Sequence, residues 1–164
     1  MFGIKKRAST EKKLTYFKWV MKMKNSKEML ASVLKTSQMG QVGIRSVMPY
    51  AVRSELKKEL KSQLQEYDSI EREACAIASA RGWELSGIDP MAKAMSMAYA
   101  RMNLMFGNVD SKIAAMMIQG NTRGMIKSLK NQHHSKQEDS RIALLTQKLL
   151  DCETENVRQM QGYV

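Results

Sequence analysis

Two pairs of long helical segments, residues 26–81 and 111–162, constrain the fold of this 164-residue chain more than any other feature. In the first pair, apolar and small polar residues recur at alternating spacings of four and three, which is typical of helices that pack along one another. The residues of the first seam are Leu30, Leu34, Ser37, Gln41, Ile44 and Met48, and those of the second are Leu56, Leu60, Gln63, Tyr67, Ile70, Ala74 and Ile77. Asn25 with Glu28 resembles a capping box that starts the first helix, and Pro49 suits the first turn of the second. Because few residues separate the two helices, we expect them to be antiparallel neighbours.

The second pair shows the same kind of pattern. The residues of its two seams are Ile113, Met117, Ile118, Met125, Ile126 and Leu129, followed by Ile142, Leu145, Leu149, Cys152, Asn156 and Met160. Asp110 or Ser111 is expected to cap the first of these helices, and the polar stretch that follows it is expected to form a turn. The last helix is expected to be capped by Ser135, in a capping box with Glu138, or by Asp139.

The connection between the pairs, residues 82–109, contains a short helix of its own. Gly82, Gly87 and Pro90 interrupt the chain, and residues 91–106 then form a helix that rises about 24 Å, most of the length of a bundle. The sequence therefore predicts an all-α fold: a ferritin-like up-down four-helix bundle made of two helical hairpins joined by a crossover that contains a short Met-rich helix. A five-helix bundle, in which residues 91–106 are a full member, is the alternative.

Several short stretches of the chain carry a family resemblance. They are Ser111-Lys-Ile-Ala-Ala-Met-Met-Ile-Gln-Gly120 with Gly124-Met-Ile and Glu153-x-x-Asn156, the helix that contains Gln63, Glu66, Tyr67 and Ile70, and Pro90-Met-Ala-Lys. Together they resemble an uncharacterised family of small bacterial ferritin-like four-helix-bundle proteins, over about residues 25–162. The resemblance implies a fold and no activity, and residues 1–24 lie outside it.

The inward positions predict no di-iron centre. Ferritin-like sites take one Glu from each of two helices and Glu-x-x-His from each of the other two, so that carboxylates offset the charge of two cations. The corresponding motifs here are Gln63-x-x-Glu66 and Glu153-x-x-Asn156, in which amides replace two of the ligands. We therefore expect no metal and no cofactor. Glu66 and Glu153 are weak candidates for holding iron, manganese or zinc in the core.

The two histidines, His133 and His134, fall in the predicted turn between the last two helices, where they cannot reach the middle of a bundle. Together with Glu138 or Asp139 they are weak candidates for a zinc site at the turn. Because they are also remote from both cysteines, no nucleophile is paired with a base. We expect a non-enzymatic structural or interaction protein.

Polar residues on the seams predict a buried, hydrogen-bonded layer. These residues are Gln41, Gln63, Tyr67, Gln119 and Asn156. Such a layer fixes the register of packed helices. Gly120 and Gly124, four residues apart, are expected to let two helices approach closely.

Methionine accounts for 15 of the 164 residues. Eight of them lie between residues 91 and 125: Met91, Met95, Met97, Met102, Met105, Met116, Met117 and Met125. The first interpretation is core packing, because Met fills irregular gaps such as those under a crossover helix. The second is an adaptable surface for a homo-oligomer or a protein partner. Thioethers also suit Cu(I), which makes copper binding a further alternative.

Residues 1–24 form a basic tail, either disordered or an amphipathic helix, and the bundle domain is expected over residues 25–164. The tail holds eight Lys and Arg against a single Glu, which makes +7 of the formal charge of +11. Weak contact of the tail with a membrane surface or with nucleic acid is an alternative function. No stretch is apolar enough for a secretory signal or a transmembrane segment, so we expect a cytoplasmic protein. Cys75 and Cys152 are then expected to be small core residues.

Overall fold

The computed structural model describes the backbone of residues 3–134 and 139–164, and the side chains of residues 13–18, 26–133 and 139–164. In these residues the chain is helical and contains no strand, which confirms the all-α prediction. The elements are α1 (Gly3–Val47), the 3-10 helix η1 (Met48–Tyr50), α2 (Ser54–Ala80), α3 (Pro90–Asn103), α4 (Val109–His134), α5 (Ser140–Met160) and the 3-10 helix η2 (Gln161–Tyr163).

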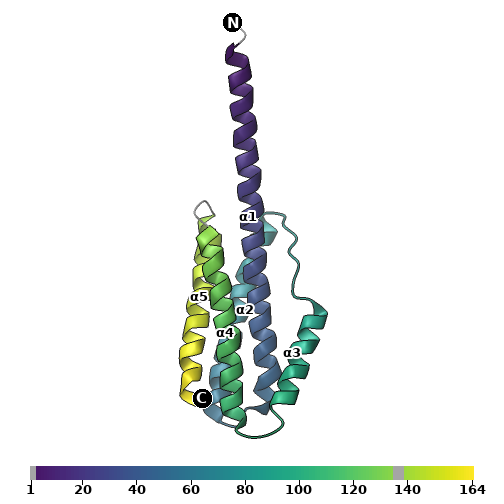
Figure 1. Cartoon of the computed structure of the whole chain (residues 1–164), viewed down its shortest axis with the longest axis vertical. Coiled ribbons are helices and arrows are strands. Elements are labelled where there is room, and N and C mark those ends of the chain that lie inside the picture. Colours follow the sequence, from purple (N-terminus) through teal and green to yellow (C-terminus); the bar gives the residue numbers. More distant parts are fainter. Residues whose placement is uncertain (1–2, 135–138) are drawn as a thin grey trace.

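The four longest helices lie side by side, and α3 lies outside them (Figure 1). α1 runs antiparallel to α2, and α4 runs antiparallel to α5. After α2, Gly82 has a φ of +61°, the left-handed conformation that suits the end of a helix. The segment from there to α4 travels along the molecule and includes α3, which packs against α1. As a result, α2 and α4 run in the same direction (Figure 1).

The seams of α2 and α5 are buried, as their spacing predicts. Every predicted seam residue of these two helices is buried. On α1 all predicted seam residues are buried except the last, Met48, which is half-buried in η1. Regular spacing of large side chains therefore predicts burial well on three of the four long helices.

The predicted seam of α4 is partly wrong. Two of its members, Ile126 and Leu129, are exposed at 49% and 50%. The inward positions in this half of the helix are instead the small or polar residues Asn121, Gly124 and Ser128. These residues keep the spacing of three and four, but a search for large apolar side chains passes over them.

The start of the first bundle helix is also corrected. α1 begins at Gly3, so the Asn25–Glu28 pattern lies inside a continuous helix and does not cap one. No Pro occurs before Pro49 to interrupt this helix. Asn and Glu both tolerate interior helical positions, which is why a capping pattern alone does not establish a boundary.

The N-terminal part of α1 projects beyond the other helices (Figure 1). Leu14, Tyr16 and Phe17 on this part are exposed. The side chains of residues 1–12 and 19–25, which carry most of the basic groups, lie outside the described residues. Contact of this segment with a membrane surface or nucleic acid therefore stays a prediction. Within the described part of the chain, none of the helices combines the length and apolar character needed to cross a membrane.

α2 begins at Ser54 and not at Pro49, which lies in η1. The carboxylate of Asp110, in the first turn of α4, explains the difference. It accepts hydrogen bonds from the backbone N–H groups of Val52 at 2.7 Å and Arg53 at 2.9 Å. These bonds hold the residues before α2 in a turn and tie the two hairpins together at this end of the molecule.

The caps of α4 and α5 follow the expected chemistry, with one change of residue. Asn108, and not Asp110 or Ser111, caps α4, because its side chain accepts a hydrogen bond from the N–H of Ser111 at 3.3 Å. Asp139 caps α5 by accepting from the N–H of Arg141 at 2.9 Å. The alternative capping box before Asp139 lies outside the described residues.

Candidate functional site

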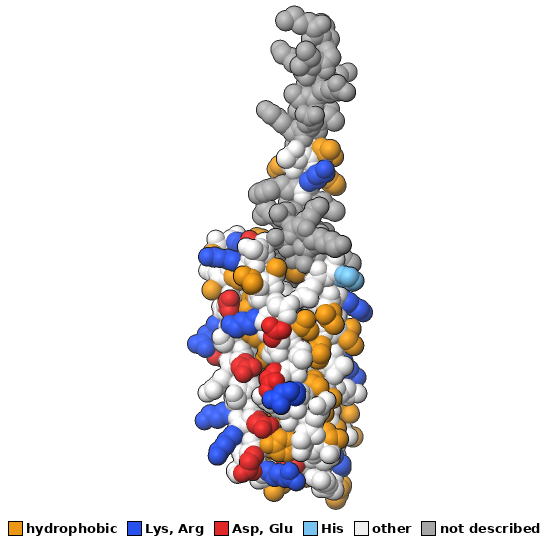
Figure 2. Space-filling model, turned by 90° about the vertical axis from the view of Figure 1, so that its left-hand side faces the viewer, with side chains coloured by type: hydrophobic (Ala, Val, Ile, Leu, Met, Phe, Trp, Pro, Cys, Tyr) orange, Lys and Arg blue, Asp and Glu red, His pale blue; other side chains and the backbone are white. Residues whose placement is uncertain are grey.

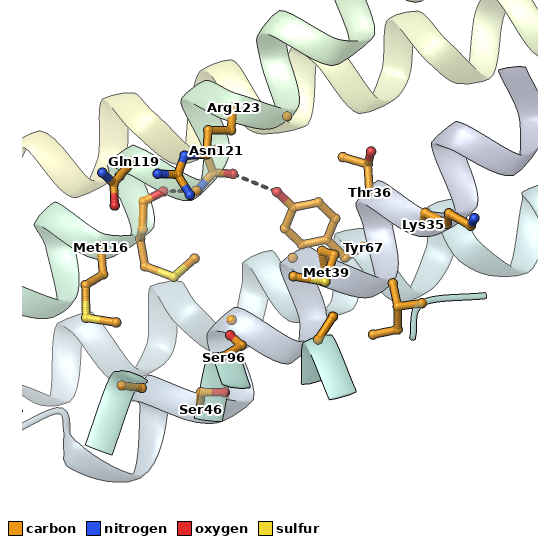
Figure 3. A pocket seen from close by; sticks show the side chains of 18 of the residues that line it. Lys35, Thr36, Met39, Ser46, Tyr67, Ser96, Met116, Gln119, Asn121 and Arg123 are labelled. Atoms are coloured by element: carbon orange, nitrogen blue, oxygen red, sulfur yellow. Dashed lines mark hydrogen bonds between the residues drawn. The ribbon is translucent and has the colours of Figure 1, made fainter. Parts of the chain in front are cut away.

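Three buried polar side chains from three helices meet in the core, and Figure 3 shows two of them, Tyr67 and Asn121. Tyr67 of α2 donates a hydrogen bond to Asn121 Oδ1 of α4 at 2.6 Å, and Asn156 of α5 donates to the same oxygen at 3.2 Å. The Asn121 amide in turn donates to the backbone carbonyl of Met117 at 2.7 Å. Two of the predicted polar residues thus share a partner that the sequence did not single out. Gln119, which was expected inside, is exposed.

Gln41 and Gln63 are buried, but each belongs to a separate hydrogen-bonded group. Gln41 of α1 donates to the carboxylate of Glu71 on α2 and accepts from Arg45 at 2.9 Å. Gln63 of α2 donates to Gln159 of α5 at 2.9 Å. The five predicted residues therefore do not form one layer, because they lie at different heights along the helices.

Two glycines make room for the side chains that fill the space between α1 and α4. The ring of Tyr67 lies against Gly40 of α1, where an added Cβ atom would overlap it. The carboxyl group of Glu153, from α5, lies against Gly124 of α4 in the same way. In contrast, a Cβ atom at Gly120 would meet nothing within 4 Å. The predicted role of Gly120 and Gly124 is thus corrected: one faces open space and the other a side chain, not a neighbouring backbone.

Glu153 is the most strongly perturbed acid in the core. It is 1% exposed, and the hydroxyl of Ser128 donates to its Oε2 at 3.4 Å. Burial raises the pKa of Glu153 to about 8, because the hydrogen bond from Ser128 and the charge of Lys127 offset only part of the lost hydration. The carboxyl group is therefore protonated at neutral pH.

The metal candidates are not brought together. Glu66 is exposed while Glu153 is buried, and His133 is exposed at the end of α4. The side chains of His134 and Glu138 lie outside the described residues. Among the side chains that are described, no three His, Cys, Asp or Glu residues lie close enough together to hold a metal ion.

A groove of about 810 Å³ opens beside the polar core (Figure 3). α1 and α4 supply its long walls, and α3 with the residues before it covers one side. Gly40, Gly43, Gly120 and Gly124 all line it. A Cβ atom at Gly43, like one at Gly120, would meet nothing within 4 Å, so the missing side chains at these two positions leave the groove open.

The two ends of the groove differ in charge, because α1 and α4 run in opposite directions. Lys35 of α1 lies at one end, where it faces Lys127 of α4, whereas Met116 lies toward the other end. The guanidinium group of Arg123 lies between the ends, beside Gln119 and Asn121 (Figure 3). None of the three cations forms an ion pair with a described side chain. Burial and the ammonium group of Lys35 lower the pKa of Lys127, which indicates that the two cations face each other.

Residues 91–106 form a largely apolar surface, which we call the α3 face. Its exposed large side chains are Met91, Met95, Met97, Tyr99, Met102, Met105 and Phe106. Within α3 itself only Ala100 is buried. Most methionines of the crossover are therefore not core residues, which corrects the first interpretation of them. Met117 is buried, and Met116 and Met125 are half-buried.

The face formed by α5 and its neighbours is different (Figure 2). Basic and acidic side chains are interspersed over part of it. Lys148 of α5 pairs with Glu73 of α2 at 2.9 Å, and Arg158 pairs with Glu155 at 2.6 Å. Cys75, which was expected in the core, is exposed on α2, whereas Cys152 is buried. This is the composition of a hydrated surface.

Comparisons of the chain with protein-family models, with curated proteins and with solved structures found no match. The α3 face and the groove are thus the two features from which a function can be inferred.

Proposed function

We propose that this chain is a non-enzymatic interaction protein that self-associates through the α3 face. The observation that carries the proposal is the exposure of seven large apolar side chains within residues 91–106, at 52% to 77% each. An apolar surface of this kind on a short helix gains free energy when it is covered, at roughly 25 cal/mol per Å². A ferritin-like chain path that lacks the di-iron ligands is the scaffold that we propose for it.

A second copy of the chain fits this face better than a charged partner. Lys93 and Arg101 are the only ionised side chains of α3, and the helix has no acidic residue after its cap Asp89. Two copies of α3 packed in a symmetric contact would therefore bring few like charges together. Methionine side chains adapt to a partner surface because they are unbranched and polarisable.

The thiols and the histidine that is described do not offer a catalytic pair. Burial, followed by the neighbouring Glu66, raises the pKa of the Cys152 thiol, so the thiolate form is disfavoured. Burial and Glu71 also raise the pKa of Cys75. These shifts run opposite to those of activated nucleophiles, which supports a non-enzymatic role.

The test is the molar mass of the full chain in solution, measured by light scattering or sedimentation at micromolar concentration. We expect a dimer or larger species for the wild type and a monomer for the double variant Met95→Lys, Met102→Lys. Leu144→Lys is the matched control, because Leu144 is 70% exposed on α5 and lies outside the α3 face. A monomeric wild type, or dissociation by the control variant alone, contradicts the proposal.

The rival class is a metal-handling protein, in which Glu66 and Glu153 would bind iron, manganese or zinc, or methionines would bind Cu(I). Met91 and Met95 are one helical turn apart and both exposed, which is the observation that favours copper. Elemental analysis of protein purified without chelator or affinity tag separates the two classes. Stoichiometric copper, iron, manganese or zinc in that sample supports metal handling and contradicts a purely structural role.

A further inference from the structure

The groove is long in relation to its volume. Its walls extend from Lys35 to Val47 on α1 and from Met116 to Lys127 on α4. At 1.5 Å per residue these stretches span about 17 Å. A groove of about 810 Å³ with such walls suits an elongated organic ligand and not a single ion.

The body of the groove is apolar. Met39, Val47, Ile88, Met116 and Met117 contribute to its lining. Open glycine positions on both walls widen the space between these side chains. Such a lining binds alkyl groups, because burial of each methylene is favourable by about 0.8 kcal/mol.

One end of the groove carries two lysine side chains. Lys35 and Lys127 face each other there and form no ion pair with a described side chain. Glu153 lies near Lys127, but burial raises its pKa and so favours its neutral form, in which its O–H is a hydrogen-bond donor. Asp89 also lines the groove, and its carboxylate accepts from the backbone N–H of Met91 at 2.6 Å.

We propose that this groove binds a free amphiphile of the fatty-acid class. Its carboxylate lies at the end formed by Lys35 and Lys127, and its alkyl tail extends toward Val47 and Met116. The site shares Tyr99 with the α3 face through which the chain is proposed to self-associate, but neither Met95 nor Met102 lines the groove.

Isothermal titration of the full chain with dodecanoate, below its micellar concentration, tests the proposal. We expect saturable binding of one dodecanoate per chain. Affinity falls about fourfold for each methylene removed in the series down to octanoate. Dodecanol and dodecyltrimethylammonium, which have the same tail, bind at least tenfold more weakly because the cationic end of the groove does not stabilise their head groups.

Glycine substitutions locate the binding site. Gly43→Leu and Gly120→Leu place a side chain in open space within the groove, so each is expected to weaken dodecanoate binding at least tenfold. Gly162→Leu is the matched control, because its Cβ also meets nothing within 4 Å but the residue lies in η2, outside the groove. Lys127→Gln tests the head-group end without filling the groove, and it should reduce the preference for dodecanoate over dodecanol. Circular dichroism of each variant verifies that it is folded.

Three results would overturn the proposal. The first is the absence of saturable binding of dodecanoate to the wild type. The second is that dodecyltrimethylammonium binds the wild type as strongly as dodecanoate does, or that Gly43→Leu and Gly120→Leu bind dodecanoate as strongly as the wild type does. The third is binding only to phosphatidylglycerol vesicles, which would assign the cations to a membrane surface. The Met95→Lys, Met102→Lys variant should still bind dodecanoate, so the failure of one proposal is distinguished from the failure of the other.

Discussion

The helices α2 and α5, which pack on each other, contain no glycine, whereas α1 and α4 each carry glycines beside the core. α2 and α5 carry large buried side chains such as Leu60 and Leu149 at most inward positions. α1 and α4 carry glycines at positions 40 and 124, and the space next to them is filled by side chains from the other two helices. One pair therefore supplies large side chains to the core, whereas the glycines of the other pair leave space for two of them, Tyr67 and Glu153. Beside the open positions Gly43 and Gly120 a groove remains.

The largest expected effect is the loss of a side chain from the close-packed pair. Leu149→Ala, at a position that is 1% exposed, should lower the free energy of unfolding by about 2–5 kcal/mol. Leu129→Ala is the control, because Leu129 is 50% exposed on α4 and should change stability by less than about 1 kcal/mol. Urea denaturation of both variants measures the difference. Equal losses would contradict the burial of Leu149 or the exposure of Leu129.

The buried acid that lies against Gly124 gives the next largest effect. Glu153 has a folded-state pKa of about 8, above the ordinary value of 4.5, so between these pH values the folded chain holds a proton that the unfolded chain releases. Wild-type stability should therefore fall as pH rises from about 4.5 to 8, whereas Glu153→Gln should lack this fall. The gap between them should reach a few kcal/mol near pH 8 and vanish near pH 4. Urea denaturation across this pH range tests it, and parallel curves would contradict the burial of this acid.

Alanine at Gly40 and Gly124, where another side chain occupies the space that a Cβ atom would need, should also destabilise the protein. Gly40→Ala forces the ring of Tyr67 to move, and Gly124→Ala displaces the carboxyl group of Glu153. Overpacking of this kind lowers the free energy of unfolding by about 1–3 kcal/mol. Thermal denaturation of each variant is the measurement. A melting temperature equal to that of the wild type would mean that these side chains have another position available.

Alanine at Gly43 and Gly120, which face open space, should have the smallest effect and should stabilise the protein. Gly43→Ala and Gly120→Ala add a methyl group where nothing lies within 4 Å. Because Ala is favoured over Gly within a helix, each should raise the free energy of unfolding by about 0.5–1 kcal/mol. Each lies on the same helix as a filled glycine and serves as its matched partner. If all four variants shifted stability in the same direction, the contrast between filled and open positions would be wrong.

The sequence by itself determined the helices, the all-α class and the buried faces of α2 and α5. Large residues at spacings of four and three form a continuous stripe on a helix, and the hydrophobic effect buries such a stripe whatever it packs against. Caps such as Asp139 were also predictable, because a carboxylate satisfies the free N–H groups of a helix start locally. Tyr67 and Asn156 were identified as inward polar residues for the same reason of spacing.

Only the tertiary structure decided what faces the glycines of α1 and α4. The local sequence does not show that Tyr67 occupies the space beside Gly40 and Glu153 the space beside Gly124, because each of these side chains comes from another helix. Nor does it show that the space beside Gly43 and Gly120 is empty. The same holds for Asn121, whose partners lie 54 and 35 residues away in the chain. Whether the methionines of α3 are buried also depended on where that helix docks. Local spacing specifies which face of a helix turns inward, but the empty or filled space beyond that face is a property of all the helices together.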